Sequence, residues 1–353
     1  MELNKAYLQK VFCAFFPEKR IEDFLVLDQG HINVSVKILS KSGTFLLQRI
    51  NESVFRDIDS LCNTKFAIIS DLKSAINYPV EYYQTTHRAK HFENWICCNF
   101  LEDSNSYTFC PNRDIAFSAG HGLATFSKAL RDIEVSDYPE IIPDFHAINK
   151  RFSDLEKAFD TCKSNQLLSD ALPLFEELKS LKPHWYALQT SIDEKKLKTQ
   201  LIHNDSKLSN FLFDKSQRTL ALIDLDTVMP GFLAYDFGDA VRSVTSLCPE
   251  DSTKWDQIGY SEDYFQGFVK GYFEELKNCL KPADLESLFP GILHMIAIMS
   301  IRFLTDYLNG SIYFSISHST HNLDRARNQL LLLKCFIRDR QKIQNHMYSL
   351  FQF

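Results

Sequence analysis

The sequence predicts an α+β fold of two lobes, in which a small antiparallel sheet with one helix is followed by a larger, mostly helical lobe. The chain has 353 residues, of which 45% are hydrophobic, so it can bury more than one sizeable core. Short apolar runs separated by turn residues occupy the first hundred positions, whereas later apolar residues mostly recur at helical spacing. We therefore place the lobes at residues 1–100 and 104–353, with a hinge near 99–103.

The first lobe is expected to begin with an amphipathic helix and to continue as a sheet of about five strands. Turn residues at Gly30 and at Ser42-Gly43 separate the first three strands. The predicted elements are a helix at 1–16, strands at 24–27, 34–39 and 44–50, a helix at 57–76, and strands at 79–83 and 91–100.

The second lobe is expected to consist of helices around one hairpin. Asn112 is a suitable N-cap for a helix over 113–131. Residues 152–192 are predicted to form two antiparallel helices that break around Leu172-Pro173, where proline interrupts the helical pattern. Four further helices are predicted at 235–246, 261–278, 282–309 and 321–340.

Two short apolar runs, 210–213 and 219–223, flank a polar bend and predict the hairpin. Polar residues gather at one end of it, before the first strand and after the second. They are His203, Asp205, Lys207, Asn210, Asp224 and Asp226.

This grouping favours phosphoryl transfer. Asp205 and Asn210 have the five-residue spacing of a kinase catalytic loop, and Asp224 stands where a metal-binding aspartate follows the next strand. Magnesium prefers such oxygen ligands, together with phosphates. The alternative is that His203 and Asp205 only cap a loop, as short polar side chains often do.

Composition excludes other classes of function. A net charge of −6 without a basic tract argues against nucleic acid as a partner. Nine scattered cysteines without a C-x-x-C pair indicate free thiols in a reducing compartment. The longest apolar run, 288–301, is broken by Pro290, His294 and Ser300 and is shorter than the roughly 18 residues of a membrane span. We expect a cytoplasmic protein without a membrane segment; a monomer is the working expectation.

Six stretches together resemble the aminoglycoside phosphotransferase and choline kinase superfamily, and most closely its bacterial N-acetylhexosamine 1-kinase branch. They are DQGHIN at 28–33, LLQRIN at 46–51, HNDSKLSN at 203–210, IDLDTVMPG at 223–231, DFGDAVR at 236–242 and IRFLTDYLNGSIYF at 301–314. The resemblance implies a protein-kinase-like fold that uses ATP and Mg2+ (magnesium).

The catalytic and metal residues follow from the motif. Asp205 is expected to accept the proton of the attacking hydroxyl, and Lys207 to spread the charge of the transferring phosphate. Asn210 and Asp224 are expected to hold the metal. Asp226 either joins the metal or orients Lys207, and we favour the second. Lys207 could also be an exposed loop lysine. By the resemblance, Asp236 braces the catalytic loop.

The nucleotide is expected at the first lobe and the hinge. The glycine-containing loop would approach the phosphates, although an ordinary turn also needs a glycine. The hinge backbone would read the adenine, although it could be a plain linker. The predicted residues are Gly30, His31, Asn33, Gln48, Asn99 and Leu101.

One departure from the broader kinase pattern stands out. The third strand carries Gln48 in place of a lysine, and the facing helix centre, Lys65 and Phe66, offers no glutamate. The usual ion pair that grips the nucleotide is therefore missing, which lends some support to a nucleotide-binding regulator without turnover.

The resemblance implies a small neutral amino sugar as acceptor, phosphorylated at the anomeric hydroxyl of GlcNAc or GalNAc. Its predicted contacts are His31, His146, Arg302, Asp306, Tyr307 and Tyr313. From chemistry alone, His146 is a hydrogen-bond donor to a sugar, and Arg302 with Asp306 could instead form an intrahelical salt bridge. Other open alternatives are kinases for choline, homoserine, methylthioribose or an aminoglycoside.

Overall fold

The computed structural model describes residues 3–27 and 32–351. The chain forms two compact units. Unit 1 comprises Met1–Ser104, Ser136–Pro143 and Asp224–Met229, and unit 2 comprises Asn105–Val135, Asp144–Ile223 and Pro230–Phe353. Unit 1 therefore takes two segments from the part of the sequence that follows the hinge. The predicted α+β class, with a small antiparallel sheet before a helical region, is confirmed.

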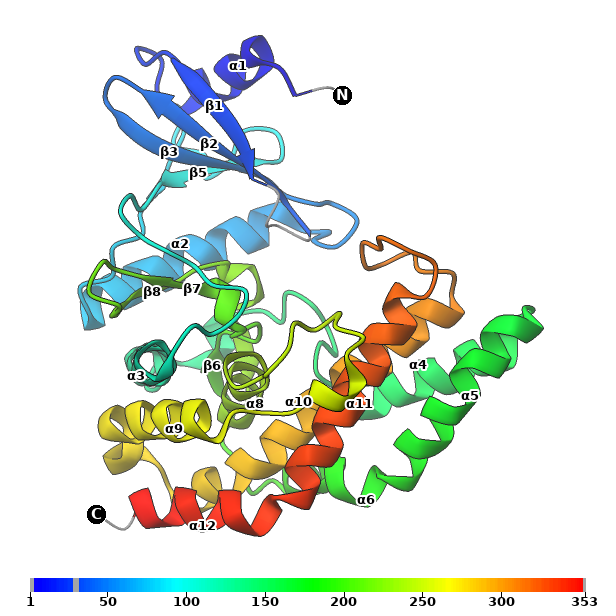
Figure 1. Ribbon diagram of the computed structural model, residues 1–353. Helices are drawn as coiled ribbons and strands as arrows, with labels where there is room; N and C mark the ends of the chain where they lie inside the picture. Colours follow the sequence, from blue (N-terminus) through cyan, green and yellow to red (C-terminus); the bar gives the residue numbers. More distant parts are fainter. Residues whose placement is uncertain (1–2, 28–31, 352–353) are drawn as a thin grey trace. The chain divides into compact units, whose positions relative to one another are not determined.

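Unit 1 contains an antiparallel sheet and two helices, one before the first strand and the other between the third and fourth strands in sequence (Figure 1). The strand order is β1-β2-β3-β5-β4. Asn4 and Asp57 cap the two helices by accepting from Tyr7 N and Ser60 N. The second helix begins within one residue of its predicted start, whereas the first begins at Lys5, four residues after its predicted start. The elements are α1 (Lys5–Phe15), β1 (Asp23–Leu27), β2 (Val34–Ser40), β3 (Gly43–Arg49), α2 (Ile58–Ala75), β4 (Tyr82–Tyr83) and β5 (Trp95–Asn99).

Two apolar clusters hold unit 1 together. In one, Val11 and Phe12 of α1 are buried with Ile38 of β2. In the other, Leu61 of α2 is buried with Ile96 of β5. The last two strands are shorter than predicted.

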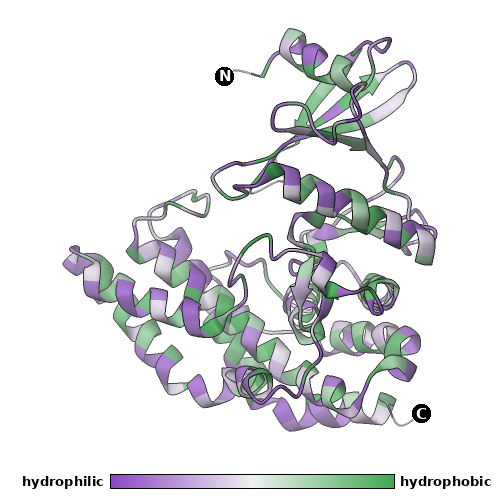
Figure 2. Ribbon diagram, turned by 180° about the vertical axis from the view of Figure 1, so that it is seen from behind, coloured by the Kyte–Doolittle hydropathy of each residue, from purple (hydrophilic) through white to green (hydrophobic). Residues whose placement is uncertain are grey.

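Unit 2 contains helices around two pairs of short strands, β6 with β9 and β7 with β8. Hydrophobic and hydrophilic stripes run along its long helices (Figure 2). Helix α10 packs on α8 and α11. The elements are α3 (Arg113–Leu130), α4 (Ile148–Thr161), α5 (Asn165–Ser180), α6 (Lys182–Trp185), α7 (Ala187–Asp193), β6 (Gln200–Ile202), β7 (Phe211–Phe213), β8 (Thr219–Leu222), β9 (Met229–Gly231), α8 (Leu233–Val244), α9 (Glu262–Leu276), α10 (Pro282–Leu308), α11 (His321–Arg338) and α12 (Arg340–Phe351).

The predicted break around Leu172-Pro173 is wrong. The chain breaks earlier, between α4 and α5, where Ser164 accepts a hydrogen bond from Leu167 N and starts a new helix. Pro173 lies inside α5, which continues through it to Ser180. The terminal helix α12 was not predicted separately.

Helix α10 continues through Pro290 and is longer than the apolar run suggested. By length and composition this helix of 27 residues, which contains an 18-residue stretch with a mean hydropathy of 1.6, could cross a membrane. However, 78% of that apolar stretch is buried inside the protein, as in a core helix. The nine cysteines are all free thiols, as predicted.

Candidate active site

The loop after β6 is held by the start of α8. The two carboxylate oxygens of Asp236 accept from His203 N and Asn204 N, each at 2.7 Å, and the hydroxyl of Ser206 donates to its main-chain oxygen at 2.7 Å. Burial raises the pKa of Asp236 to about 6, against the opposing effect of these partners. Asp236 thus has the geometry of a brace for the loop that carries Asp205.

Asp205 is the centre of a charged cluster in this loop. Its Oδ2 accepts from Lys207 Nζ at 2.9 Å and from Asn210 Nδ2 at 3.0 Å. Burial alone would raise the pKa of Asp205, but the Lys207 ammonium and the Asn210 amide hold it at about 2. The carboxylate is therefore ionised and can accept a hydrogen bond from a hydroxyl group.

His203 joins the loop to the end of the hairpin. Its Nε2 lies 2.8 Å from the main-chain oxygen of Ile223, and its Nδ1 lies 3.3 Å from Asp205 N. Because a carbonyl only accepts and a main-chain N–H only donates, Nε2 carries the proton and Nδ1 is the unprotonated acceptor. The fully buried ring is therefore a fixed connector between Asp205 and β8.

Asn210 and Asp224 have the oxygen chemistry that magnesium requires. The Nδ2 of Asn210 donates to Asp205, to the main-chain oxygen at 2.7 Å and to the side chain at 3.0 Å. Asp224 follows β8 with a left-handed backbone, φ 64° and ψ 56°. Among the described residues no three His, Cys, Asp or Glu side chains form a metal cluster.

Asp226 makes contacts that the sequence did not predict. It belongs to unit 1, where Oδ1 forms an ion pair with Lys65 Nζ and Oδ2 accepts from Asn33 Nδ2. The other end of the Asn33 amide accepts from Asn51 N at 2.9 Å. Both oxygens of Asp226 thus have partners within unit 1. Sequence reasoning missed Lys65 because only a glutamate was sought on α2.

The other predicted nucleotide residues lie on the sheet and at its edge. Gln48 donates to the hydroxyl of Ser35 at 3.2 Å. The Asn99 amide accepts from Glu81 N at 2.7 Å and donates to Pro79 O at 2.9 Å, so it fixes the end of β5. Ser104 donates to the main-chain oxygen of Leu101 at 2.7 Å.

Gly30 and His31, which were also predicted to contact the nucleotide, lie outside the described residues.

His146 is a buried neutral ring that contacts the loop carrying Asp205. Its Nε2 bonds Asn204 O at 2.8 Å, and burial lowers its pKa to about 3. Because Nε2 donates, Nδ1 is an acceptor, and no described residue bonds it. The sequence predicted a donor; the structure gives an acceptor. Sequence reasoning missed a second histidine, His294, whose Nε2 lies 3.2 Å from the main-chain oxygen of His146.

Arg302 is enclosed by aromatic rings. Its guanidinium carbon lies 5.4, 5.5 and 5.3 Å from the ring centroids of Phe145, Tyr313 and Phe314. Nη2 also reaches the Tyr313 hydroxyl at 3.4 Å. Among the described residues Arg302 forms no ion pair with Asp306, so the intrahelical salt bridge is absent.

Asp306 instead anchors the loop that follows α10. Oδ1 accepts from Ile312 N at 3.0 Å and Tyr313 N at 2.9 Å, and Oδ2 accepts from Phe314 N at 3.0 Å and Asn322 Nδ2 at 2.9 Å. This carboxylate therefore sets the position of Tyr313 and Phe314 beside Arg302.

Tyr307 faces away from this group. It is 3% exposed, and its hydroxyl donates to Asp170 of α5 at 3.0 Å. A direct contact of Tyr307 or Asp306 with an acceptor is not tested by these contacts and stays a prediction.

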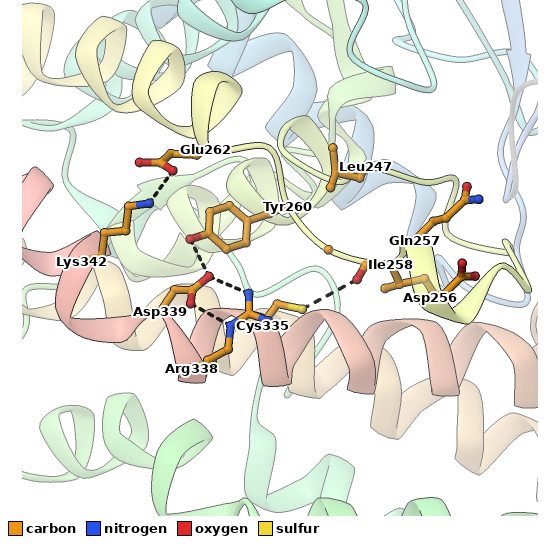
Figure 3. A pocket seen from close by; sticks show the side chains of 11 residues that line it. Leu247, Asp256, Gln257, Ile258, Tyr260, Glu262, Cys335, Arg338, Asp339 and Lys342 are labelled. Atoms are coloured by element: carbon orange, nitrogen blue, oxygen red, sulfur yellow. Dashed lines mark hydrogen bonds and ion pairs between the residues drawn. The ribbon is translucent and has the colours of Figure 1, made fainter.

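A surface cavity of about 560 Å³ lies elsewhere on unit 2, between the loop after α8 and helices α11 and α12 (Figure 3). Its charged side chains pair with one another: Arg338 with Asp339 at 2.8 Å, and Lys342 with Glu262. None of the predicted site residues lines it.

The chain matches a known protein family. The model of the phosphotransferase enzyme family fits residues 84–276, more than half of the sequence. The chain therefore belongs to the phosphotransferase enzyme family.

Individual relatives are distant. A probable ethanolamine kinase from Nematostella vectensis is 24% identical over 190 residues, which are 52% of this chain and 51% of that protein. The match thus spans about half the length of that curated relative.

Solved structures share the fold. An aminoglycoside phosphotransferase from Alicyclobacillus acidocaldarius is 14% identical with a TM-score of 0.62 over 100% of this chain and 96% of its own. A microcompartment-associated aminopropanol kinase is 14% identical with a TM-score of 0.63 over 95% and 98%. Ethanolamine kinase from Plasmodium vivax is 17% identical with a TM-score of 0.58 over 86% and 80%.

Proposed function

We propose that this protein is an ATP-dependent small-molecule kinase that phosphorylates the anomeric hydroxyl of an N-acetylhexosamine. The observation that carries the kinase assignment is the ionised Asp205, which Lys207 and Asn210 hold in a loop braced by Asp236.

In the proposed reaction Asp205 orients the acceptor hydroxyl and accepts its proton. The acceptor oxygen forms a bond to the γ-phosphorus while the bond from that phosphorus to the bridging oxygen breaks, and ADP leaves. Lys207, already beside Asp205, carries positive charge that offsets the charge of the transferring phosphoryl group. Asn210 and Asp224 would hold Mg2+, which would supply further neutralisation of the phosphates. Gly30, His31, Asn33, Gln48, Asn99 and Leu101 remain proposed contacts of the nucleotide.

A neutral acceptor is favoured by the surroundings of Arg302. An aromatic enclosure attracts an ammonium group through the negative faces of its rings. Here Phe145, Tyr313 and Phe314 already surround a cation that belongs to the chain. An ammonium ligand placed there would meet a like charge, whereas sugar hydroxyls and an acetamido oxygen can accept from the guanidinium.

His146 adds a matching group. It contacts Phe145, which also contacts Arg302, and its bare Nδ1 can accept a hydrogen bond from a sugar hydroxyl. We therefore propose His146, Arg302 and Tyr313 as acceptor contacts, with Asp306 acting through the loop that it anchors.

The test compares neutral amino sugars with cationic acceptors. ADP release with ATP and Mg2+ would be measured for GlcNAc, GalNAc, glucosamine, choline, ethanolamine and kanamycin, and the product examined by phosphorus NMR. We expect turnover with GlcNAc or GalNAc, phosphate on the anomeric oxygen, and little turnover with glucosamine, which is GlcNAc with a cationic amine. Turnover restricted to choline, ethanolamine or kanamycin, or phosphate on the 6-hydroxyl, would refute the proposed acceptor.

A nucleotide-binding regulator without turnover is the second candidate, favoured by Gln48 in place of the usual lysine. It predicts nucleotide binding with no ADP release for any acceptor in the panel.

A further inference from the structure

The ion pair between Lys65 and Asp226 is buried in unit 1. The lysine side chain is 1% exposed and the aspartate 3%. Lys65 comes from α2, and its ammonium also lies 5.1 Å from the ring centroid of Tyr82. Among the described residues of unit 1, Lys65 is the one buried side chain with a positive charge.

Stability alone is a weak reason for such a pair. Desolvation of two buried charges roughly offsets their attraction, and apolar side chains of similar size often serve a core as well. A buried pair is better attested as a device that fixes which segments come together. Here it joins α2 to the segment Asp224–Met229, which is far away in sequence and belongs to the same compact unit.

The joined segment carries the proposed metal ligand. Asp224 has φ 64°, a left-handed conformation that few residues other than glycine adopt. Two residues later Asp226 is held from both sides, by Lys65 and by Asn33 at the start of β2. The two contacts therefore restrain the short turn that presents Asp224.

We propose that Lys65 is a positioning residue for the metal-bound nucleotide: by holding Asp226 it fixes the backbone on which Asp224 presents its carboxylate. This inference rests on the proposed function and adds a role that the motif does not assign. The chain thus has a buried pair between a lysine on α2 and an aspartate after β8, whereas the broader kinase pattern has a lysine on β3 and a glutamate on the following helix.

The experiment measures ADP binding by calorimetry at a series of Mg2+ concentrations, without any acceptor. Lys65→Met removes the charge and keeps the length. We expect the Mg2+ concentration for half-maximal ADP binding to rise about 10- to 100-fold, the usual effect of losing an outer partner of a metal ligand. Lys73→Met, an exposed lysine on the same helix, is the matched control and should behave as wild type.

A double variant keeps the test decisive, since Lys65→Met leaves the Asp226 charge buried without its cation. Lys65→Met/Asp226→Asn removes both charges, so we expect a wild-type melting transition together with the same raised Mg2+ requirement. A folded double variant with wild-type Mg2+ dependence would overturn the proposal, and so would loss of folding in both variants. Wild-type protein that binds no ADP at any Mg2+ concentration would overturn the proposed function as well.

Discussion

His203 donates a hydrogen bond of 2.8 Å from Nε2 to the main-chain oxygen of Ile223, the residue directly before Asp224. The same ring accepts from Asp205 N through Nδ1. One buried imidazole therefore relates the position of the proposed catalytic carboxylate to the point where the chain leaves β8. Several measurable consequences come from this and from the neighbouring contacts.

Replacing His203 by leucine should destabilise the protein and disturb the site together. The variant leaves Ile223 O without its donor, which costs roughly 1–3 kcal/mol for a buried polar group. His203→Gln keeps a side-chain donor and should recover part of that loss. Urea unfolding gives the stability of both variants. Equal stability of His203→Leu and wild type would show that the bond contributes nothing.

Asp205→Asn should separate chemistry from binding. The variant keeps the size of the side chain but cannot accept a proton, so we expect turnover to fall by roughly 10²- to 10⁴-fold while ADP affinity changes little. Steady-state kinetics and calorimetry measure the two effects. Asp132→Asn, an exposed carboxylate, is the control. Near-normal turnover in Asp205→Asn would mean that another group is the base.

Arg302→Leu should weaken binding of the sugar and allow a cationic ligand to bind among the three aromatic rings. Loss of the guanidinium removes hydrogen bonds from a charged donor, so sugar binding should weaken by about 1.5–3 kcal/mol while the Michaelis constant for ATP stays unchanged. The three rings would then lack their cation, and choline should become a measurable competitor of the sugar. An unaltered sugar constant in a well-folded variant removes Arg302 from the site.

Asp306→Asn should loosen the anchored loop without touching the catalytic loop. An amide nitrogen in place of one oxygen cannot accept from the main-chain N–H groups of residues 312–314, at a cost of about 1–3 kcal/mol. We expect a lower melting temperature and a higher Michaelis constant for the sugar, with ATP kinetics as in wild type. Glu286→Gln, on the exposed side of α10, serves as control. A changed ATP constant in Asp306→Asn would contradict this picture.

His294 should make the protein less stable in mild acid. Burial lowers its pKa from 6.5 to about 4. Between these values the unfolded chain binds a proton that the folded chain does not, so the free energy of unfolding decreases as pH falls, by up to about 1.4 kcal/mol per pH unit. His294→Gln keeps a donor for His146 O and should flatten the decrease. Urea unfolding at pH 7, 6 and 5 measures the slope, with His87→Gln as an exposed control. An unchanged slope would argue against the lowered pKa.

Local pattern predicted much of this molecule. The hairpin and the Asp205–Asn210 contact depend on residues close in sequence, so spacing alone placed them together. The helix start after Asn112 likewise follows from a side chain that caps its own first turn.

Contacts between distant segments could not be predicted in this way. Lys65 and Asp226 are 161 residues apart, and Phe145 approaches Arg302 from the turn that precedes α4. Asp306 was expected in the acceptor site because its spacing from Arg302 puts both on one helical face, yet its oxygens turn to the main chain of the next loop. Pro173 misled the prediction because α5 continues through a proline that usually interrupts a helix.

Unit 1 is formed by separate segments of the chain, which limits how the gene can be truncated or recombined. A fragment that ends at Ser104 contains α2 but lacks the segment Asp224–Met229. In such a fragment Lys65 would face an apolar interior with no carboxylate, and a lone buried charge is far more costly than a paired one. The small unit is therefore not a transferable module, and a chimaera that exchanges it must also exchange Ser136–Pro143 and Asp224–Met229.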